Sequence, residues 1–471
     1  MKTRFAPSPT GWMHFGNVRT AIFNFLFSRQ QQAVFLLRIE DTDRERSADE
    51  FLQGLLLDLK WLHLDWNEGP YQQSQRAAVY DEYYQQLEQH AAAYPCFCSD
   101  DDLEVMRKVQ ASAGQPPRYA GTCRNLSKEV VQQRLQAGER ATLRFAVPRD
   151  QTIEFNDLVK GLQRFATNDI GDFVIRRNDG TASFMFCNAI DDATMQVTHA
   201  LRGDDHLANT PRQLMILQAL NLPHPQYGHF AMINGTDGTP LSKRNGSQAV
   251  RDLREQGYHP LAVINYLARL GHYYAENDFM SVDKLAELFS LTHINTAPAR
   301  HDIAHLRHWQ KEAILQASLE EIISLITPYI ANAIPADKIA EFATVVRENI
   351  LMPSDVVLWV NAVAEQKLTF STTDTELLSK AGKEFFAAAV VAVQHNSQLT
   401  FKELADAVKE RTGCKGKELF MPLRIALTGQ NHGPELAKLM GFMSTDLILA
   451  RFNNVLADIG GSRDGFKKVM A

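Results

Sequence analysis

Residues 4–19 form a turn-rich stretch whose residue types suit the binding of a phosphate. The stretch reads RFAPSPTGWMHFGNVR, and apolar residues at helical spacing follow it. This pattern predicts a strand, a tight turn and the start of a helix. Such a turn presents free backbone N–H groups and the positive end of the helix dipole to a ligand. His14 and Gly16 lie where that ligand would bind, although each residue is also explained by a structural role alone.

Acidic residues follow the apolar run 34–39, which reads as a buried strand. Glu40, Asp41 and Asp43 come where the run ends, and parallel α/β sheets bind ligands at the carboxyl ends of their strands. Asp43 also fits an acidic helix start. Glu40, nearest to the strand, is therefore the better candidate for a binding role.

Two arginines in predicted strands have the chemistry to bind a carboxylate. Arg202 ends the strand-like run VTHALRG, and Arg4 lies in the first strand. A guanidinium matches a carboxylate with two parallel hydrogen bonds. A site built in this way rejects apolar amino acids, because its own polar groups would be left unpaired. Taken singly, each arginine is also explained by a surface ion pair.

A glycine-rich loop, GTDGTPLSKRNGS at 235–247, carries the adjacent cations Lys243 and Arg244. Its reach, charge and glycine hinges suit a loop that closes over phosphates. An ordinary exposed basic loop has the same composition.

Three of the five cysteines, Cys96, Cys98 and Cys123, are spaced so that they could supply three thiolates to zinc. A zinc site needs a fourth ligand, and reduced thiols without any metal are the alternative. The candidates for the fourth ligand are His90, Tyr119 and the aspartates of Asp100–Asp102.

Composition describes an ordinary globular protein of several domains. The chain has 471 residues, of which 45% are hydrophobic. No apolar run approaches the ~18 residues of a membrane helix, and the first strand begins too early to leave room for a targeting segment. We therefore expect a cytoplasmic protein that contacts no membrane. The net charge of −6 means that any nucleic acid would have to be bound by local basic surfaces.

The order of the predicted elements indicates an α/β protein with a helical C-terminal part. Strand, helix and strand with a short connection predict a parallel βαβ unit, and the residues from 303 onwards read as almost wholly helical. In the polar region between, Asp179-Gly180 predicts a hairpin between strand-like runs. We expect a Rossmann-like parallel-sheet domain (1–94 and 191–235), an α+β insertion (95–190), a loop region (236–302) and an all-α region (303–471).

Together these stretches resemble the class I aminoacyl-tRNA synthetases, in their glutamyl branch. PSPTGWMHFGN is similar to the HIGH motif, with Asn17 in place of the second histidine. PLSKR is similar to the KMSKS motif, with Pro240 in place of the first lysine. RIEDTDRER, GPYQQSQR and the segments 172–213, 258–272 and 412–436 also look like the family. The resemblance implies ATP-dependent attachment of glutamate to the 3′ end of tRNA through a glutamyl-adenylate, for protein synthesis.

The resemblance also implies roles for individual residues. His14 and Lys243 would act in catalysis. The residues expected to bind ATP are Thr10, His14, Gly16, Asn17, Asp204, Leu241, Ser242, Lys243 and Arg244. The residues expected to bind glutamate are Arg4, Ala6, Ser8, Glu40, Phe184, Asn188 and Arg202. Glu40 would receive the ammonium group and Arg202 the side-chain carboxylate, while Phe184 replaces a common tyrosine and so lacks its hydroxyl.

The implied cofactors and partners are ATP with Mg²⁺, L-glutamate and tRNA, bound by a monomer. The insertion would clamp the acceptor end of the tRNA and the helical region would bind the anticodon. The resemblance supports zinc only weakly, because some relatives carry a histidine two places after the third cysteine and this chain has Asn125 there. Residues 411–430 carry four cations against one acid, a local basic surface of the kind that contacts phosphates. Among these cations we expect tRNA contacts from Lys415, Lys417 and Arg424.

Several alternatives remain open at this point. The tRNA charged could be that for glutamate, that for glutamine, or both. A relative that modifies a tRNA base would lack the helical half, and a small-molecule nucleotidyltransferase would lack both tRNA-binding parts. Pro240 and Phe184 also leave open a catalytically impaired relative that only binds tRNA. Productive activation of glutamate is expected to need bound tRNA.

Overall fold

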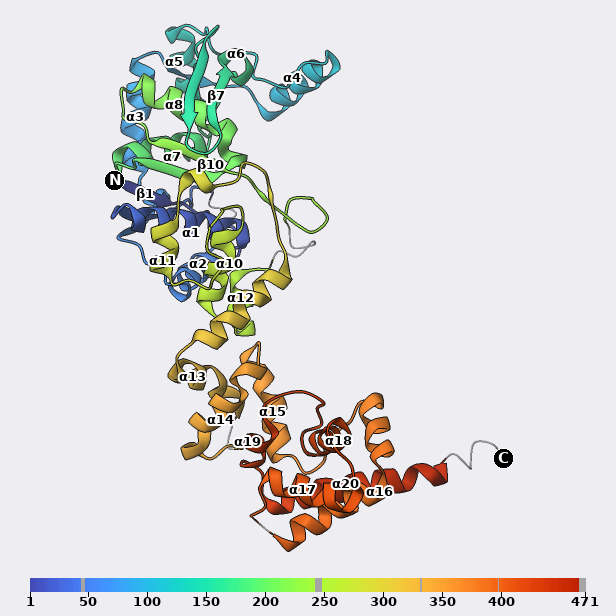
Figure 1. Cartoon of the computed structure of the whole chain (residues 1–471). Helices are drawn as coiled ribbons and strands as arrows, with labels where there is room; N and C mark the ends of the chain where they lie inside the picture. Colours follow the sequence, from blue (N-terminus) through green and yellow to red (C-terminus); the bar gives the residue numbers. More distant parts are fainter. Residues whose placement is uncertain (44–46, 242–247, 331–332, 397, 466–471) are drawn as a thin grey trace. The chain divides into compact units, whose positions relative to one another are not determined.

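The computed structural model describes residues 1–43, 47–241, 248–330, 333–396 and 398–465 (Figure 1). The chain forms two compact units. Unit 1 comprises residues 1–255 and 260–306, and unit 2 comprises residues 256–259 and 307–471.

A five-stranded parallel sheet forms the centre of unit 1, which confirms the predicted α/β fold. Its strand order is β10-β9-β1-β2-β3. The chain adds β2 and β3 on one side of β1, and β9 and β10 on the other, so the order reverses between β1 and β9. Ligands of open α/β sheets bind outside the strand ends at such a reversal. The strands are β1 (Lys2–Phe5), β2 (Val34–Ile39), β3 (Glu68–Gln72), β9 (His199–Gly203) and β10 (Gln226–Phe230).

Helix α1 (Phe15–Gln30) connects β1 to β2 and is buried on nearly every side. One side packs on the sheet, and another contacts α10 and α11. A helix that is apolar all round needs such a buried place. The other helices and short strands of unit 1 outside the insertion are α2 (Asp49–Trp61), η1 (Gln73–Gln75), α3 (Ala77–Gln89), η2 (Asp204–Asn209), β11 (Ile233–Asn234), α9 (Val250–Gln256), α10 (Pro260–Arg269), α11 (Val282–Leu288), η3 (Leu291–His293) and β12 (Ala299–Arg300).

The region between α3 and β9 contains an antiparallel sheet, β4-β5-β8, and a separate hairpin, β6-β7. The hairpin reaches the central sheet, because the N–H of Leu158 in its turn donates to the carbonyl of Tyr227 in β10 (2.8 Å). The elements are β4 (Ala93–Cys96), α4 (Asp100–Ser112), α5 (Lys128–Gln136), β5 (Thr142–Phe145), β6 (Thr152–Asp157), β7 (Gly161–Ala166), α6 (Thr167–Ile170), β8 (Phe173–Arg176) and α7 (Phe184–Thr194). Helix α8 (Thr210–Ala219) follows β9 and packs against α7.

The turn predicted at Asp179-Gly180 forms, since the N–H of Arg177 donates to the carbonyl of Thr181 (2.9 Å), but the strand expected after it is a helix. Pairing beyond the turn is limited to one bridge, Arg176 with Ala182, and α7 begins at Phe184. Short apolar runs do not distinguish a buried strand from a buried helix. Here most of α7 is buried between neighbouring elements. As a result Phe184 and Asn188, four residues apart, lie on one face of a helix.

Unit 2 is helical throughout its described residues, as predicted. Its apolar core draws on most of its helices, and buried Arg451 donates to the carbonyls of Ala362, Glu365 and Leu427 near the ends of α15 and α18. The elements are α12 (Ile303–Gln316, which begins in unit 1), α13 (Leu319–Ile330), η4 (Ala336–Lys338), α14 (Ile339–Val346), η5 (Arg347–Asn349), η6 (Pro353–Asp355), α15 (Val356–Ala364), α16 (Thr372–His395), α17 (Phe401–Thr412), α18 (Lys417–Thr428), α19 (Leu436–Met440) and α20 (Thr445–Gly465).

Among the described residues, no single helix has both the length and the apolar character needed to cross a membrane. Helices α12 and α13 meet that test only as a pair, and they are bent by 113° at the break between them.

Candidate active site

A cavity of about 640 Å³ opens at the carboxyl ends of β1, β2 and β9, where the strand order reverses. It brings together most of the residues predicted to bind ATP or glutamate. The predicted residues in its lining are Arg4, Ala6, Ser8, Thr10, His14, Gly16, Asn17, Glu40, Phe184, Asn188 and Arg202.

His14 forms the N-cap of α1 at the mouth of this cavity. Its Nδ1 accepts the N–H of Gly16 (3.1 Å), and the Oδ1 of Asn17 accepts the N–H of His14 (3.5 Å). These two bonds form a capping box, so Asn17, which replaces the second histidine, stabilises the turn. Burial lowers the pKa of His14 against the opposing charge of Asp205. A neutral imidazole with its Nε2 unused by the cap therefore faces the ligand space.

Ser242, Lys243 and Arg244 of the basic loop lie outside the described residues. The residues on either side are bonded to the cavity wall. The N–H of Leu241 donates to the carbonyl of Ile233 (2.9 Å), and the N–H of Val250 donates to the carbonyl of Met13 (3.0 Å). The loop thus begins beside β11 and ends beside the stretch that holds His14.

Arg4 and Arg38 both bind the buried carboxylate of Asp192, at 3.2 and 2.7 Å. Burial raises the pKa of Asp192, but the two arginines outweigh this effect and lower it. The charge of Arg4 is therefore neutralised inside the protein. Arg38 also donates to the Oδ1 of Asn188 (2.8 Å), which orients that amide. The side-chain amide of Asn188 in turn hydrogen-bonds Glu40, which opposes the effect of burial on the pKa of that acid.

Arg202 has a different environment. Its Nε and Nη2 donate to neutral acceptors, His229, Thr210 and Gln213. Among the described residues no carboxylate forms an ion pair with it, and its buried Nη1 has no hydrogen-bond partner. Burial lowers the pKa of Arg202 to about 10, so the group stays charged at neutral pH. A buried charge without a counter-ion is costly, and a ligand carboxylate would supply one.

Glu40 gives the cavity an acceptor. It is 8% exposed, and burial raises its pKa against the opposing charges of Arg38 and Arg4. Its backbone N–H donates to the carbonyl of Pro7 (2.9 Å), which joins the end of β2 to the turn after β1. One cavity thus offers a carboxylate for an ammonium group and an unpaired guanidinium for a carboxylate.

Phe184 stacks on His206, with ring centroids 5.1 Å apart and an interplanar angle of 24°. His206 and Asp205 line the cavity, and our sequence reasoning missed both. Their position directly after Arg202 and the end of β9 was the available signal. The predicted Asp204 does not line the cavity; it forms an ion pair with Lys160 (3.0 Å). Leu241 is likewise not part of the lining.

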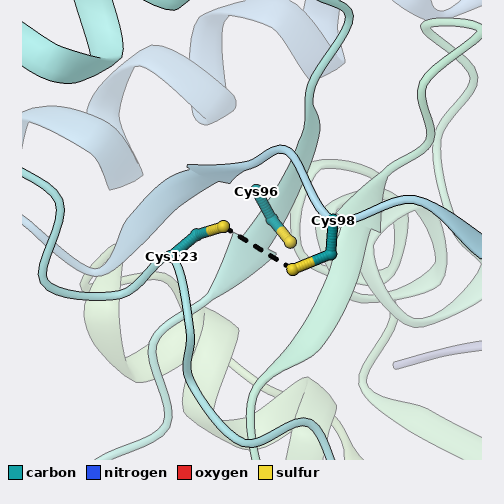
Figure 2. A group of neighbouring side chains, drawn as sticks. All are labelled: Cys96, Cys98 and Cys123. Atoms are coloured by element: carbon teal, nitrogen blue, oxygen red, sulfur yellow. Dashed lines mark hydrogen bonds between the residues drawn. The ribbon is translucent and has the colours of Figure 1, made fainter. Parts of the chain in front are cut away.

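The three clustered cysteines converge in the insertion (Figure 2). The Sγ atoms of Cys96, Cys98 and Cys123 lie within 4.8 Å of one another. The hydroxyl of Tyr119 lies 3.3 Å from the Sγ of Cys96 and 3.5 Å from that of Cys98. Three thiolates are donors that zinc prefers, and the Tyr119 hydroxyl is close enough to them to complete a four-coordinate set.

The other candidates for a fourth ligand have different contacts. His90 lies 3.0 Å from the carbonyl of Ala219, and Asp102 caps α4 through Ser99. Neither belongs to the group of converging ligand atoms.

The residues predicted to contact tRNA in unit 2 fall into two kinds. Lys415 and Lys417 are exposed, Lys417 as the first residue of α18 and Lys415 two positions before it. Arg424 is half-buried in the same helix and donates to the carbonyl of Pro434 (2.9 Å), and burial lowers its pKa. Arg424 therefore stabilises the helical unit itself.

Two family models match the chain. The model described as "tRNA synthetases class I (E and Q), catalytic domain" matches residues 1–308, and the one described as "Anticodon binding domain" matches residues 319–456. The parallel sheet, the capped turn at His14 and the cavity between them thus define a class I aminoacyl-tRNA synthetase.

Similar proteins indicate which class I aminoacyl-tRNA synthetases this chain resembles. "Glutamate--tRNA ligase 2" of Nitrosococcus oceani is 51% identical over 462 residues, 96% of this chain and 98% of that protein. "Glutamate--tRNA ligase 2" of Coxiella burnetii is 50% identical over 459 residues, with the same coverage. The crystal structure of a glutamate tRNA ligase from Elizabethkingia meningosepticum in complex with its amino acid has a TM-score of 0.88 at 27% identity, covering 98% of this chain and 99% of that one. The chain belongs to the glutamate–tRNA ligase family.

Proposed function

We propose that this protein attaches glutamate to the 3′ end of tRNA for protein synthesis, using ATP and forming a glutamyl-adenylate. The observation that carries the proposal is the pairing of two opposite groups in one cavity. Glu40 is a buried acceptor, and Arg202 is a buried cation with an unpartnered Nη1. L-Glutamate has the ammonium and the side-chain carboxylate that satisfy both.

The chemistry depends on positioning and charge. The α-carboxylate of glutamate attacks the α-phosphorus of ATP, and pyrophosphate leaves. Transfers at phosphorus need alignment and charge neutralisation more than a protein nucleophile. We assign the ATP contacts to the turn of Thr10, His14, Gly16 and Asn17, and to Lys243. Mg²⁺ would neutralise charge on the triphosphate.

The adenylate then passes its glutamyl group to the ribose hydroxyl at the tRNA 3′ end. We assign the acceptor end to the insertion (95–190), the stem to residues 236–302 and the anticodon to the helical region (303–471), with Lys415 and Lys417 as phosphate contacts. We further propose a cytoplasmic, monomeric enzyme that needs bound tRNA to activate glutamate.

Glutamate-dependent exchange of pyrophosphate into ATP tests the activity. With cognate tRNA present, we expect exchange with glutamate and little with glutamine or aspartate. Absence of exchange with every amino acid would contradict the proposal and favour the impaired, tRNA-binding relative. Charging purified tRNA for glutamate and tRNA for glutamine in parallel identifies which of them is the substrate.

Replacing Lys243 by alanine is expected to lower the rate of pyrophosphate exchange at least tenfold. Removing one cation from the triphosphate destabilises the transition state, and a charged hydrogen bond contributes about 1.5–3 kcal/mol. The affinity for tRNA should change little. Lys438, an exposed lysine paired with Glu435 (2.8 Å), provides the control in Lys438→Ala. Full activity in Lys243→Ala would remove this residue from the catalytic assignment.

We also propose that Cys96, Cys98, Cys123 and Tyr119 bind zinc, which would supply a structural cross-link within the insertion. Tyr119→Phe is expected to weaken zinc binding at least tenfold, because the substitution removes the hydroxyl oxygen that we propose as the fourth ligand. Competition with a chelator measures the affinity. The control is Tyr94→Phe, which removes a hydroxyl from the same region that bonds Asp172 (2.6 Å) instead. Equal zinc affinity in both variants would show that Tyr119 is not a ligand.

A further inference from the structure

The turn of the β6-β7 hairpin places a buried carboxylate behind the amino-acid cavity. Asp157, at the end of β6, is 2% exposed and faces His229 of β10, which is fully buried. Asp157 is not part of the cavity lining. It belongs to the insertion, whereas His229 belongs to the central sheet.

Asp157 accepts hydrogen bonds at both of its oxygens. Its Oδ1 accepts the backbone N–H groups of Val159 (2.9 Å), Lys160 (2.9 Å) and His229 (3.2 Å). Its Oδ2 lies 2.5 Å from the Nδ1 of His229. Burial raises the pKa of Asp157, but these hydrogen bonds outweigh burial and lower it. The carboxylate is therefore ionised at neutral pH and only accepts hydrogen bonds.

This carboxylate determines the tautomer of His229. Since Oδ2 can only accept, the Nδ1 of His229 carries the proton, and burial lowers the pKa of the ring so that it stays neutral. The Nε2 then has a lone pair that accepts the Nε–H of Arg202 at 3.1 Å, and the hydroxyl of Thr210 lies 3.1 Å from the same nitrogen. Thr210 and Gln213 accept from Nη2 at 2.9 and 2.7 Å. The Nη1 alone is left for a ligand.

The neutral ring also keeps the charge of Arg202 available. Arg4 binds Asp192 directly, at 3.2 Å, and its charge is compensated within the protein. Arg202 is held instead by an imidazole that stands between it and Asp157. The guanidinium is thus fixed in direction without a carboxylate in contact that would compete with the substrate.

We propose that Asp157 and His229 are positioning residues for Arg202, and that through it they set the affinity and selectivity for glutamate. Asp157 fixes the protonation of His229, and His229 fixes the orientation of Arg202. This inference rests on the proposed function, because it assigns Arg202 to the side-chain carboxylate. It also makes the insertion hairpin a structural part of the amino-acid site.

We call the chain of hydrogen bonds from Asp157 through His229 to Arg202 the relay. Asp157→Asn tests it with almost no change in side-chain size. The amide oxygen can still accept the three backbone N–H groups, but its NH₂ group replaces Oδ2 and donates to Nδ1. The proton of His229 then moves to Nε2, where it opposes the N–H of Arg202. We expect KM for glutamate to rise about 10- to 100-fold, the loss of one hydrogen bond to a charged group. KM for ATP should stay within about twofold of wild type.

Asp172→Asn is the matched control. Asp172 is a buried acid of the same insertion that accepts from Arg124 (2.8 Å) and Tyr94 (2.6 Å), and it does not line the cavity. This variant should lower the melting temperature without raising KM for glutamate. An equal rise of KM in both variants would reduce the role of Asp157 to general stability and overturn the proposal.

A second pair of variants keeps the test valid if Asp157→Asn does not fold. In His229→Gln the side-chain amide can donate to Asp157 and accept from Arg202, so we expect KM for glutamate within about threefold of wild type. His229→Leu removes the acceptor and should raise KM at least tenfold. Equal KM values in these two variants would contradict the relay. Wild-type protein without glutamate-dependent exchange would instead refute the proposed function on which the relay rests.

Discussion

Replacing Arg202 by methionine is expected to lower kcat/KM for glutamate about a thousandfold. Removing one partner of a buried, hydrogen-bonded charge pair costs about 2–5 kcal/mol, and each 1.4 kcal/mol is about a factor of ten. Since the Nη1 of Arg202 has no partner in the protein, the substrate carboxylate would lose its main donor. Pyrophosphate exchange over a range of glutamate concentrations measures the effect.

The same variant should reduce the preference for glutamate over glutamine. Glutamine carries no side-chain charge for Arg202 to bind, so its slow reaction should change far less than that of glutamate. Arg212→Met is the control, because Arg212 lies nearby on α8, donates to the carbonyl of Ala208 (2.5 Å) and does not line the cavity. A wild-type preference in Arg202→Met would show that another group selects the side chain.

Replacing Glu40 by glutamine is expected to raise KM for glutamate about a hundredfold. The ammonium group of the substrate would lose a charge-assisted hydrogen bond in a buried site, a loss of about 1.5–3 kcal/mol. Asp41→Asn is the control, since Asp41 is the next residue, binds Ser74 (2.8 and 2.6 Å) and does not line the cavity. An unchanged KM in Glu40→Gln would show that the ammonium group binds elsewhere.

The pH dependence gives a second measurement on the same residue. Burial raises the pKa of Glu40 above its ordinary value of 4.5, and only the ionised carboxylate binds an ammonium group. KM for glutamate in the wild type should therefore rise as the pH falls through this raised pKa. Glu40→Gln should lack that dependence, because the amide does not titrate.

The raised pKa of Glu40 also predicts how this residue affects the stability of the fold. An acid whose pKa is higher in the folded than in the unfolded state costs folding free energy at pH values above its unfolded pKa. Glu40→Gln should therefore melt no lower than the wild type at pH 7. A strongly lowered melting temperature would indicate that Glu40 stabilises the fold rather than serving the substrate.

The features that the sequence determined depend on residues close together in the chain. The turn at residues 4–19 and the cap of α1 use neighbours such as His14 and Gly16, so their types and spacing reveal them. The end of β2 at Ile39 places Glu40 at the edge of the sheet through one local run. The helical C-terminal region follows from a repeated spacing of apolar residues, and the structure and family comparison confirm both parts of the fold.

The tertiary structure decided the features that join distant residues. The run after Gly180 became a helix because its surroundings bury it on most sides, which a short apolar run does not encode. Arg4 and Arg202 look equivalent in the sequence, because both are arginines in predicted strands. In the structure Asp192 pairs with Arg4 and not with Arg202. Asp157 reaches His229 across 72 positions, and the Tyr119 hydroxyl reaches Cys96 across 23. Such contacts leave no periodic trace in the chain, because the fold alone brings the partners within hydrogen-bond distance.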